Sequence, residues 1–189
     1  MSSKNKLRKK FYLLRKKKYF EIDEKFFFPL IKFLKIKLKK KAFKIALYYP
    51  SNFELNVLKV LENPYISNKN TLLPAIEENN NMNFFPWKKN EVLFINKYGI
   101  PEPIKSRAKV PEVVLVPILV FDKFKFRIGY GKGFYDRYLT KLIKRYKKIL
   151  TVGVAFSFQR YHKLPVSKND VRLDFILTDK GLIEWIYWY

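Results

Sequence analysis

Cysteine is absent from the 189 residues, and histidine occurs only once, as His162. Without cysteine the chain forms no disulfide bond, no thiolate zinc site and no thiolate nucleophile. A single histidine likewise excludes a histidine-rich metal site. Acidic residues are also scarce, with 16 Asp and Glu against 40 Lys and Arg. These absences exclude the cysteine-dependent enzymes and most classes of metalloenzyme.

Long hydrophobic runs are missing as well. The longest apolar run in the middle of the chain, residues 113–121, is far shorter than the roughly 18 residues that a membrane helix needs. Apolar residues nevertheless make up 48% of the chain and aromatic residues 18%, which is typical of a packed domain and not of a disordered polymer. We expect one domain over residues 1–189, located in the cytoplasm without a membrane partner.

The positive charge is unevenly distributed. Residues 1–44 carry 17 basic and 3 acidic side chains, residues 45–100 carry five of each, and residues 101–189 carry 18 and 8. Such an excess suggests nucleic-acid binding, electrostatic steering of small anions, or the amino-acid bias of an AT-rich genome. Because 32 of the basic residues are Lys and only 8 are Arg, the nucleic-acid interpretation is weakened, since Arg is favoured for bidentate contacts.

Apolar spacing predicts alternating helices and strands. Helices are expected at 3–18, at 21–41 with Pro29 early in it or dividing it, at 53–61, and from Gly133 to about Lys148. Strands are expected at 43–49, 71–74, 92–95, 113–121, 150–156 and 173–178, with a loop at 77–83 and an aromatic tail, 185–189, packed on the domain. This order predicts an α/β fold: a layered, Rossmann-like domain with a mostly parallel sheet, helices on both faces, and ligands bound beyond the carboxyl ends of the strands.

A glycine-rich segment, residues 127–136, holds three of the six glycines of the chain, alternating with other residues at positions 129, 131 and 133. Alternate glycines expose successive N–H donors, and a following helix start adds positive potential, so this pattern is suited to holding a phosphate chain. Arg127 and Lys132 supply full charges, and Asp136 is placed to hold a magnesium ion. The pattern is neither a Walker A loop nor the dinucleotide fingerprint. An ordinary turn between strand and helix, with Asp136 as a first-turn acid, remains the alternative.

The segments flanking this loop strengthen the interpretation. In order, they are KNKLR at 4–8, Glu54, IPEP at 100–103, Val116-Pro117, Phe121-Asp122, RIGYGKGFYDRYL at 127–139, VGVAF at 152–156, Gln159, Leu164-Pro165 and Asn169-Asp170. Together they resemble the 5-formyltetrahydrofolate cyclo-ligase family over nearly the whole chain. One departure is Ile118, which follows Pro117 where the family usually has glycine.

The resemblance implies a reaction. Family members close 5-formyltetrahydrofolate, with or without a polyglutamate tail, to 5,10-methenyltetrahydrofolate, using ATP and Mg²⁺ and releasing ADP and phosphate. The formyl oxygen is a poor leaving group, so its phosphorylation makes displacement by the neighbouring folate nitrogen feasible. A monomer that needs no nucleic acid is the implied state.

Site residues are carried over by motif. ATP is expected to contact Lys4, Asn5, Lys6, Leu7, Arg8, Arg127, Ile128, Gly129, Tyr130, Gly131, Lys132, Gly133, Phe134 and Tyr135. The folate is expected to contact Arg8, Tyr49, Glu54, Tyr130, Gly131, Lys132, Gly133 and Phe134. Arg127 and Lys132 are the expected catalytic residues, and Asp136 and Asp170 the expected magnesium ligands.

Each assignment has a structural alternative. Lys4 and Arg8 also fit a solvated charge run, Glu54 fits the start of a helix, and Asp170 fits a turn. Two other functions stay open: a nucleic-acid-binding protein that uses the basic helix at 3–18, and a folate or nucleotide binder without turnover.

Overall fold

The structure is a computed structural model that describes residues 3–39, 42–66, 68–78, 80–146 and 148–183. A seven-stranded sheet is built from β1 (Ile45–Ala46), β2 (Thr71–Ile76), β3 (Met82–Pro86), β6 (Val113–Pro117), β9 (Leu150–Val154), β11 (Phe175–Thr178) and β12 (Gly181–Ile183). The strand order is β12-β11-β9-β6-β1-β2-β3. All neighbouring pairs are parallel except β11–β12 and β2–β3 at the two edges. The predicted mostly parallel α/β sheet is confirmed.

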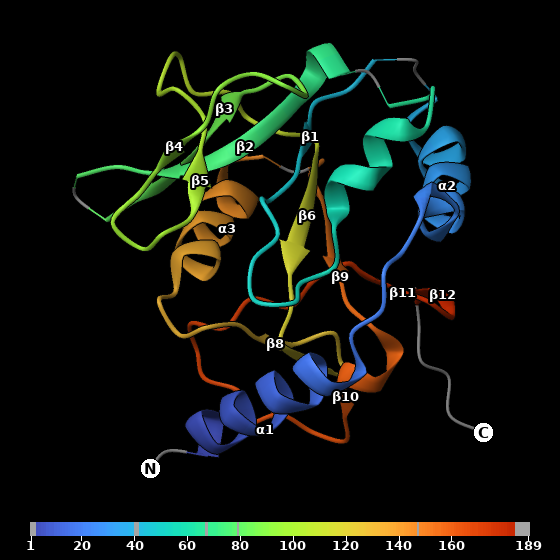
Figure 1. Cartoon of the computed structure of the whole chain (residues 1–189), viewed down its shortest axis with the longest axis vertical. Helices are drawn as coiled ribbons and strands as arrows, with labels where there is room; N and C mark the ends of the chain where they lie inside the picture. The colour runs from blue at the N-terminus through green and yellow to red at the C-terminus, as the bar shows by residue number, and fades with distance from the viewer. Residues whose placement is uncertain (1–2, 40–41, 67, 79, 147, 184–189) are drawn as a thin grey trace.

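Helices cover both faces of this sheet, as predicted. Helix α2 (Phe28–Leu38) and helix α3 (Phe134–Arg145) are drawn on opposite sides of β6 in Figure 1. Along β6 the side chains alternate, so that Val113 and Leu115 pack in the cluster that contains α2, and Val114 and Val116 pack in the cluster that contains α3. A strand buried on both faces needs such a continuous apolar run, which explains its sequence.

Helix α1 (Ser3–Lys18) packs on a second, smaller sheet. This sheet consists of β7 (Val120–Asp122), β8 (Arg127–Ile128) and β10 (Arg160–Tyr161), in the order β10-β7-β8. Leu7 and Phe11 of α1 are buried against Leu119, Val120 and Ile128. The basic helix therefore lies beyond the carboxyl end of β6, where ligands bind in sheets of this kind (Figure 1).

The strand predicted over 113–121 is interrupted. It divides into β6 and β7 at Ile118 and Leu119, because the carbonyl groups of both residues are bonded outside the main sheet. The Gln159 Nε2 donates to both carbonyls at 2.9 Å, and the Arg15 Nη1 donates to that of Ile118 at 3.1 Å. Ile118 is not among the residues with positive φ, so this position needs no glycine backbone.

One predicted element is wrong, and a second is shorter than predicted. Residues 53–61 do not form an α-helix: Asn52 and Phe53 have positive φ values of 49° and 63°, which a right-handed helix cannot include, and only a 3₁₀ helix, η2 (Val57–Glu62), follows. The loop predicted at 77–83 is shorter than expected, because β3 begins at Met82 and pairs antiparallel with β2.

Other boundaries shift. The helix predicted at 21–41 is divided into η1 (Glu24–Phe27) and α2, with Pro29 in the first turn of α2, and residues 40–41 lie outside the described residues. Only Ile45–Ala46 of the strand predicted at 43–49 is paired. Helix α3 ends at Arg145 instead of near Lys148, and the tail at 185–189 is not described.

The remaining elements are short. Strand β4 (Phe94–Ile95), part of the strand predicted at 92–95, pairs antiparallel with β5 (Pro101–Glu102), and η3 (Asn68–Asn70) and η4 (Ser157–Gln159) are single 3₁₀ turns. None of the helices in the described part of the chain is long and apolar enough to cross a membrane.

Candidate active site

The glycine-rich segment connects β8 to α3. Gly131 and Gly133 have positive φ values of 94° and 69°, and Gly133 is the N-cap residue of α3. Glycine is needed at both positions because side-chain-bearing residues rarely adopt this backbone. The loop therefore ends at the N-terminus of a twelve-residue helix, whose unpaired N–H groups attract anions.

Arg8 of α1 is packed against this loop. Its Nε donates to the Gly129 carbonyl at 2.9 Å, and its Nη1 donates to the Asn5 side chain at 2.5 Å. A Cβ at position 131 would lie 3.0 Å from the Arg8 Cζ. The absence of a side chain at Gly131 thus lets the guanidinium approach the loop backbone.

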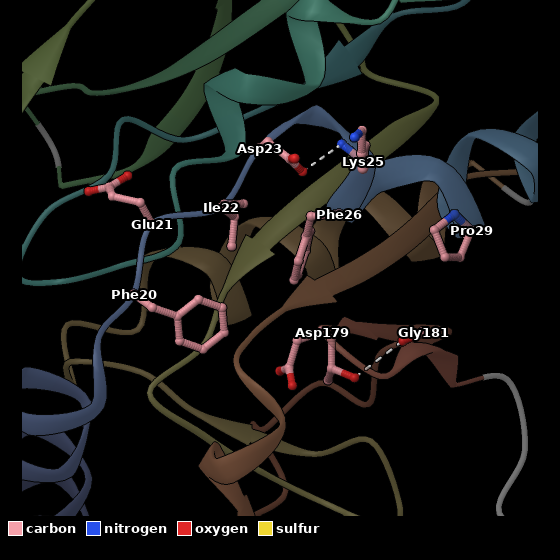
Figure 2. Close-up of a pocket in the computed structure, with 10 residues that line it drawn as sticks. Phe20, Glu21, Ile22, Asp23, Lys25, Phe26, Pro29, Asp179 and Gly181 are labelled. Atoms are coloured by element: carbon pink, nitrogen blue, oxygen red, sulfur yellow. Dashed lines mark hydrogen bonds between the residues drawn. The ribbon is translucent and has the colours of Figure 1, made fainter.

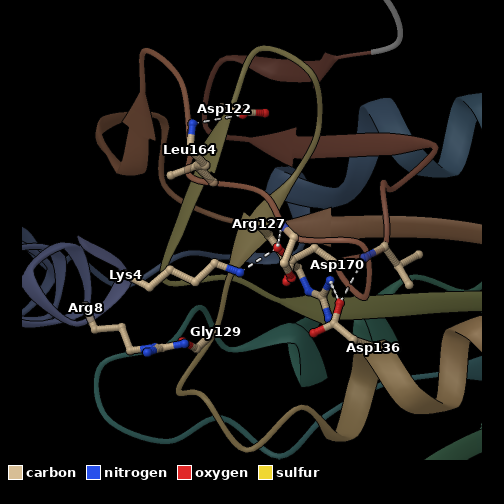
Figure 3. Close-up of polar contacts among 10 residues, drawn as sticks. Lys4, Arg8, Asp122, Arg127, Gly129, Asp136, Leu164 and Asp170 are labelled. Carbon is tan, nitrogen blue, oxygen red and sulfur yellow. Dashed lines mark hydrogen bonds and ion pairs between the residues drawn. The ribbon is translucent and has the colours of Figure 1, made fainter. Parts of the chain in front are cut away.

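Two ion pairs meet at this place, one between distant segments and one within the glycine-rich segment (Figure 3). Lys4 Nζ lies 2.5 Å from Asp170 Oδ2, and Arg127 Nη1 lies 2.9 Å from Asp136 Oδ1. The N–H of Val171 also donates to Asp136 Oδ1 at 3.1 Å, so the residue after Asp170 touches Asp136. The start of α1, the glycine-rich segment and residues 170–171 therefore converge, as the predicted ATP and metal residues require.

The two predicted metal ligands are suited to Mg²⁺. Each carboxylate bonds within the described residues through one oxygen, Oδ1 of Asp136 and Oδ2 of Asp170, which leaves its second oxygen for a cation. Burial raises the pKa of Asp170, but the hydrogen bonds from Lys4 and Ser167 outweigh it and hold that pKa below its usual value. No group of three or more His, Cys, Asp or Glu that could hold a metal occurs in the described residues. Two carboxylates completed by phosphate oxygens are a common magnesium environment.

Glu54 follows the carboxyl end of β1 and acts electrostatically on Tyr130 of the loop. It is 7% exposed, and its Oε2 accepts hydrogen bonds from the Ser51 N–H at 3.0 Å and the Ser51 hydroxyl at 3.3 Å. Burial raises the pKa of Glu54 to about 7, although Arg15 and Ser51 act to lower it. It does not begin a helix, so the macrodipole alternative does not apply here.

Arg15 is a residue of the site that the sequence did not reveal. It is 1% exposed, and its guanidinium donates to the carbonyls of Asn52 at 2.8 Å and Ile118 at 3.1 Å, and to the Tyr130 hydroxyl. Its position in the sequence indicated that it would be buried: Leu7, Phe11 and Arg15 follow one another at intervals of four residues, which places them on the same, buried face of α1. An arginine on an apolar stripe is seldom buried without a polar role.

Lys132, the second expected catalytic residue, is exposed at the loop. Its Nζ lies 5.2 Å from the centre of the Tyr98 ring, and that ring lies 5.8 Å from the ring of Phe134. Tyr98 belongs to the turn between β4 and β5, so this two-stranded segment contacts the glycine-rich loop. The Tyr98 ring contacts the Lys132 ammonium group, which forms no ion pair with a carboxylate in the described residues. Its charge is therefore available to an anion bound at the loop.

Several predicted residues contribute no side chain to this place. Leu7 and Ile128 are buried in the cluster under α1, so they offer only their main chains to a ligand. Lys6 is exposed, and Tyr49 is half-buried and makes no polar contact with the other predicted residues that are described. Tyr135 packs edge-on to Phe84, with ring centres 6.4 Å apart.

A separate hollow of about 520 Å³ lies at η1 and the turn between β11 and β12 (Figure 2). It contains none of the predicted site residues. Its carboxylates have structural partners: Asp23 accepts from the Lys25 N–H at 3.0 Å, and Asp179 accepts from the Ser157 N–H at 2.6 Å and hydroxyl at 2.8 Å. The contacts among the predicted site residues lie instead at the glycine-rich loop.

Comparison with known proteins gives a consistent result. The model of the 5-formyltetrahydrofolate cyclo-ligase family matches residues 1–179. The 5-formyltetrahydrofolate cyclo-ligase of Mycoplasma genitalium is 32% identical over 184 residues, which cover 95% of this chain and 99% of that protein. The protein of the same name from Haemophilus influenzae is 30% identical over 155 residues, 74% of this chain and 78% of that protein.

Solved structures agree. The 5,10-methenyltetrahydrofolate synthetase of Aquifex aeolicus matches with a TM-score of 0.74 and 31% identity, over 100% of this chain and 95% of that one. The enzyme of the same name from Mycoplasma pneumoniae matches with a TM-score of 0.68 and 26% identity, over 93% and 98%.

Proposed function

This chain belongs to the 5-formyltetrahydrofolate cyclo-ligase family, and we propose that it uses ATP to convert 5-formyltetrahydrofolate to 5,10-methenyltetrahydrofolate, with release of ADP and phosphate. The observation that carries the proposal is the convergence of Lys4, the glycine-rich loop and Asp170 at one place, joined by the Lys4–Asp170 ion pair and by the hydrogen bond from Val171 to Asp136. These segments are the ones expected to hold the nucleotide.

The first step is phosphoryl transfer. The formyl oxygen attacks the γ-phosphorus, the bond from that phosphorus to the bridging oxygen breaks, and ADP leaves. Catalysis of such a step consists mostly of positioning and charge stabilisation. Arg127 and Lys132 provide positive charge on the loop, Arg8 adds a guanidinium against Gly131, and the N-terminus of α3 adds N–H donors.

The second step closes the ring. The neighbouring folate nitrogen attacks the activated carbon and loses its proton, while the former formyl oxygen leaves with the phosphate. No side-chain nucleophile is needed, in agreement with the absence of cysteine. We assign to Glu54 the binding of N–H donors of the folate, because it is a buried carboxylate that acts electrostatically on Tyr130 of the loop.

Mg²⁺ would be held by the free oxygens of Asp136 and Asp170, and it would neutralise charge on the ATP phosphates. Lys4 and Arg127 hold these two carboxylates in place through their ion pairs. We include in the proposal a monomer with one domain over residues 1–189, acting in the cytoplasm where ATP is supplied.

The test mixes the protein with Mg-ATP and 5-formyltetrahydrofolate and follows the near-ultraviolet absorbance of the methenyl product. We expect product only when ATP is present. Lys132→Ala should lower kcat/KM by about a hundredfold, since a charge at the transferring phosphoryl group is lost. Lys144→Ala, which removes the same charge from an exposed position of α3, is the matched control and should behave as wild type.

Other outcomes have a definite meaning. Stabilisation by ATP and folate without product would indicate a binder without turnover. Absence of ligand binding, together with nucleic-acid affinity that falls steeply with salt and survives Lys132→Ala, would indicate a nucleic-acid-binding protein. Either result would overturn the proposal.

A further inference from the structure

Arg15 is the only fully buried cation among the largest buried side chains that are described. Its three acceptors come from three segments: Asn52 after β1, Ile118 between β6 and β7, and Tyr130 in the glycine-rich loop. The guanidinium therefore joins α1 to the carboxyl ends of two central strands and to the loop. Arginine suits this arrangement because its planar group donates in several fixed directions.

This burial is costly for the protein. Arg15 forms no ion pair with a carboxylate in the described residues, and its Nε is buried without a hydrogen-bond partner there. Taking a guanidinium out of water without full compensation disfavours folding, so such groups are usually retained for a reason. The Tyr135 hydroxyl, also buried and without a partner in the described residues, is the second such group.

Both groups are electrostatically coupled to Glu54. Arg15 lowers the pKa of Glu54 against the larger, opposite effect of burial, whereas burial and then the Glu54 charge raise the pKa of Tyr135. Tyr48, which follows β1, and Tyr130 of the loop also lie within electrostatic range of this carboxylate: burial, followed by the Glu54 charge, raises the pKa of each, that of Tyr130 to about 12. Among the residues that the structure describes, Arg15 is therefore the one cation with a marked effect on the Glu54 pKa, and the three tyrosines stay neutral near pH 7.

Glu54 is useful to a folate only when it is ionised. The pterin ring presents neighbouring N–H donors, and a carboxylate accepts from them far better than a carboxylic acid does. Ser51 already donates to Oε2, which orients the group. Because burial raises the pKa of Glu54 to about 7, the ionised fraction near neutral pH is sensitive to any nearby charge.

We propose that Arg15 is a positioning residue for the folate: its guanidinium fixes the Tyr130 hydroxyl and the carbonyl of Asn52, next to Ser51, which holds the Glu54 carboxylate for the pterin N–H donors. This inference rests on the proposed function. It predicts a larger effect on the folate than on ATP, because Glu54 is expected to bind the folate alone, whereas Tyr130 is expected to contact both substrates.

A purely structural role makes a different prediction. If Arg15 only supported the backbone, its loss would resemble the loss of Gln159, which binds the same Ile118 carbonyl at 2.9 Å and is 1% exposed. Gln159→Met is therefore the matched control. It removes a buried polar group from that carbonyl without removing a contact to Tyr130 or a charge near Glu54.

The experiment measures KM for each substrate and the pH dependence of kcat/KM for 5-formyltetrahydrofolate. In the wild type we expect the folate activity to fall on the acid side with an apparent pKa near 7, the value of Glu54. Arg15→Met should move this acid limb up by about one pH unit and raise the folate KM about fivefold at pH 7, with a smaller change in KM for ATP. Arg15→Lys, which retains the charge, should leave the limb in place.

The outcomes separate the two proposals. If the wild type forms no product, the proposed function fails. If the wild type is active but Arg15→Met keeps the acid limb in place, or raises both KM values together as Gln159→Met does, the inference about Arg15 is overturned. Should Arg15→Met not fold, Arg15→Gln, which is neutral but donates hydrogen bonds, carries the same prediction.

Discussion

Glu54 is a carboxylate for which folding and function have opposite requirements. Burial favours the protonated form, and the pKa rises from 4.5 to about 7. Folate binding, as proposed here, needs the ionised form. The cost of ionising Glu54 in its buried position therefore reduces the stability of the folded protein at neutral and alkaline pH.

Glu54→Gln tests this cost. The folded protein holds a proton on Glu54 between pH 4.5 and about 7 that the unfolded chain has released. The stabilising contribution of this group is therefore full below pH 4.5 and is lost as pH rises through about 7. Glutamine does not ionise, so the variant should gain stability relative to wild type between pH 5 and pH 8, by up to about 3 kcal/mol.

Chemical denaturation at several pH values measures this difference. The exposed Glu78→Gln controls for the loss of one negative charge. A difference between Glu54→Gln and wild type that stays constant from pH 5 to pH 8 would contradict the raised pKa.

Single residues also show what the sequence could predict. Arg8 and Asp170 were predicted because they lie in motifs that match the family. Such motifs identify residues of one site even when they are far apart in the sequence. Arg15 was not found, because it stands directly before Lys16, Lys17 and Lys18 and has the appearance of one more surface charge. Its burial depends on Asn52, Ile118 and Tyr130 arriving around it, and no local pattern specifies that.

At the scale of elements, β9 and the break between β6 and β7 depend on each other. A Cβ at Gly153 of β9 would lie 2.3 Å from the Ile118 Cδ1, and 2.8 Å from the Cδ1 atoms of Ile176 and Leu173. Ile118 therefore occupies the space next to Gly153. The isoleucine that departs from the family pattern is accommodated by packing and not by an unusual backbone.

Gly153→Ala should destabilise the protein by about 1–3 kcal/mol, because the inserted methyl group overpacks a buried layer. Adding Ile118→Ala should recover part of this loss, since the shortest of the three contacts is removed. Thermal unfolding of the two single variants and the double variant gives the coupling energy. Additive effects would show that Ile118 is not the side chain that requires glycine at this position.

Elements with strong apolar periodicity were predicted well, and those set by tertiary contacts were not. Helix α1 and strand β6 follow from their own patterns. Strand β3 begins in an Asn-rich segment and exists because β2 offers it an edge to pair with. The 3₁₀ helix at 57–62 replaces an α-helix because Asn52 and Phe53 adopt left-handed backbone before it. Hydrophobic periodicity indicates which side chains of a segment are buried. It does not indicate which distant strand that segment pairs with.

At the scale of the whole molecule, the net charge of +24 bears on the rate of substrate capture. Lys4, Arg8 and Arg127 form polar contacts within the site. Lysines outside the site, such as Lys32 and Lys37 of α2 and Lys144 of α3, are exposed to solvent. A positive surface raises the encounter rate of anions such as ATP and folates, and salt screens this effect.

We expect kcat/KM for ATP to fall several-fold between about 50 mM and about 500 mM NaCl, with kcat nearly constant. Replacing Lys32 and Lys37 of α2 with Gln, at exposed positions outside the site, should reduce this salt dependence without changing kcat. An uncharged solute at equal osmotic strength is the control. Rates that do not respond to salt would show that the surface charge has no part in capture.

The Lys4–Asp170 pair also determines when the site can exist during synthesis. The two residues are 166 positions apart, so α1 leaves the ribosome long before its carboxylate partner is made. At ordinary translation speeds this interval is roughly 10 to 30 s. Throughout it, the basic helix is present without the segment that completes the nucleotide site. The nascent chain therefore emerges as a polycation before the carboxylate that pairs with Lys4 has been made.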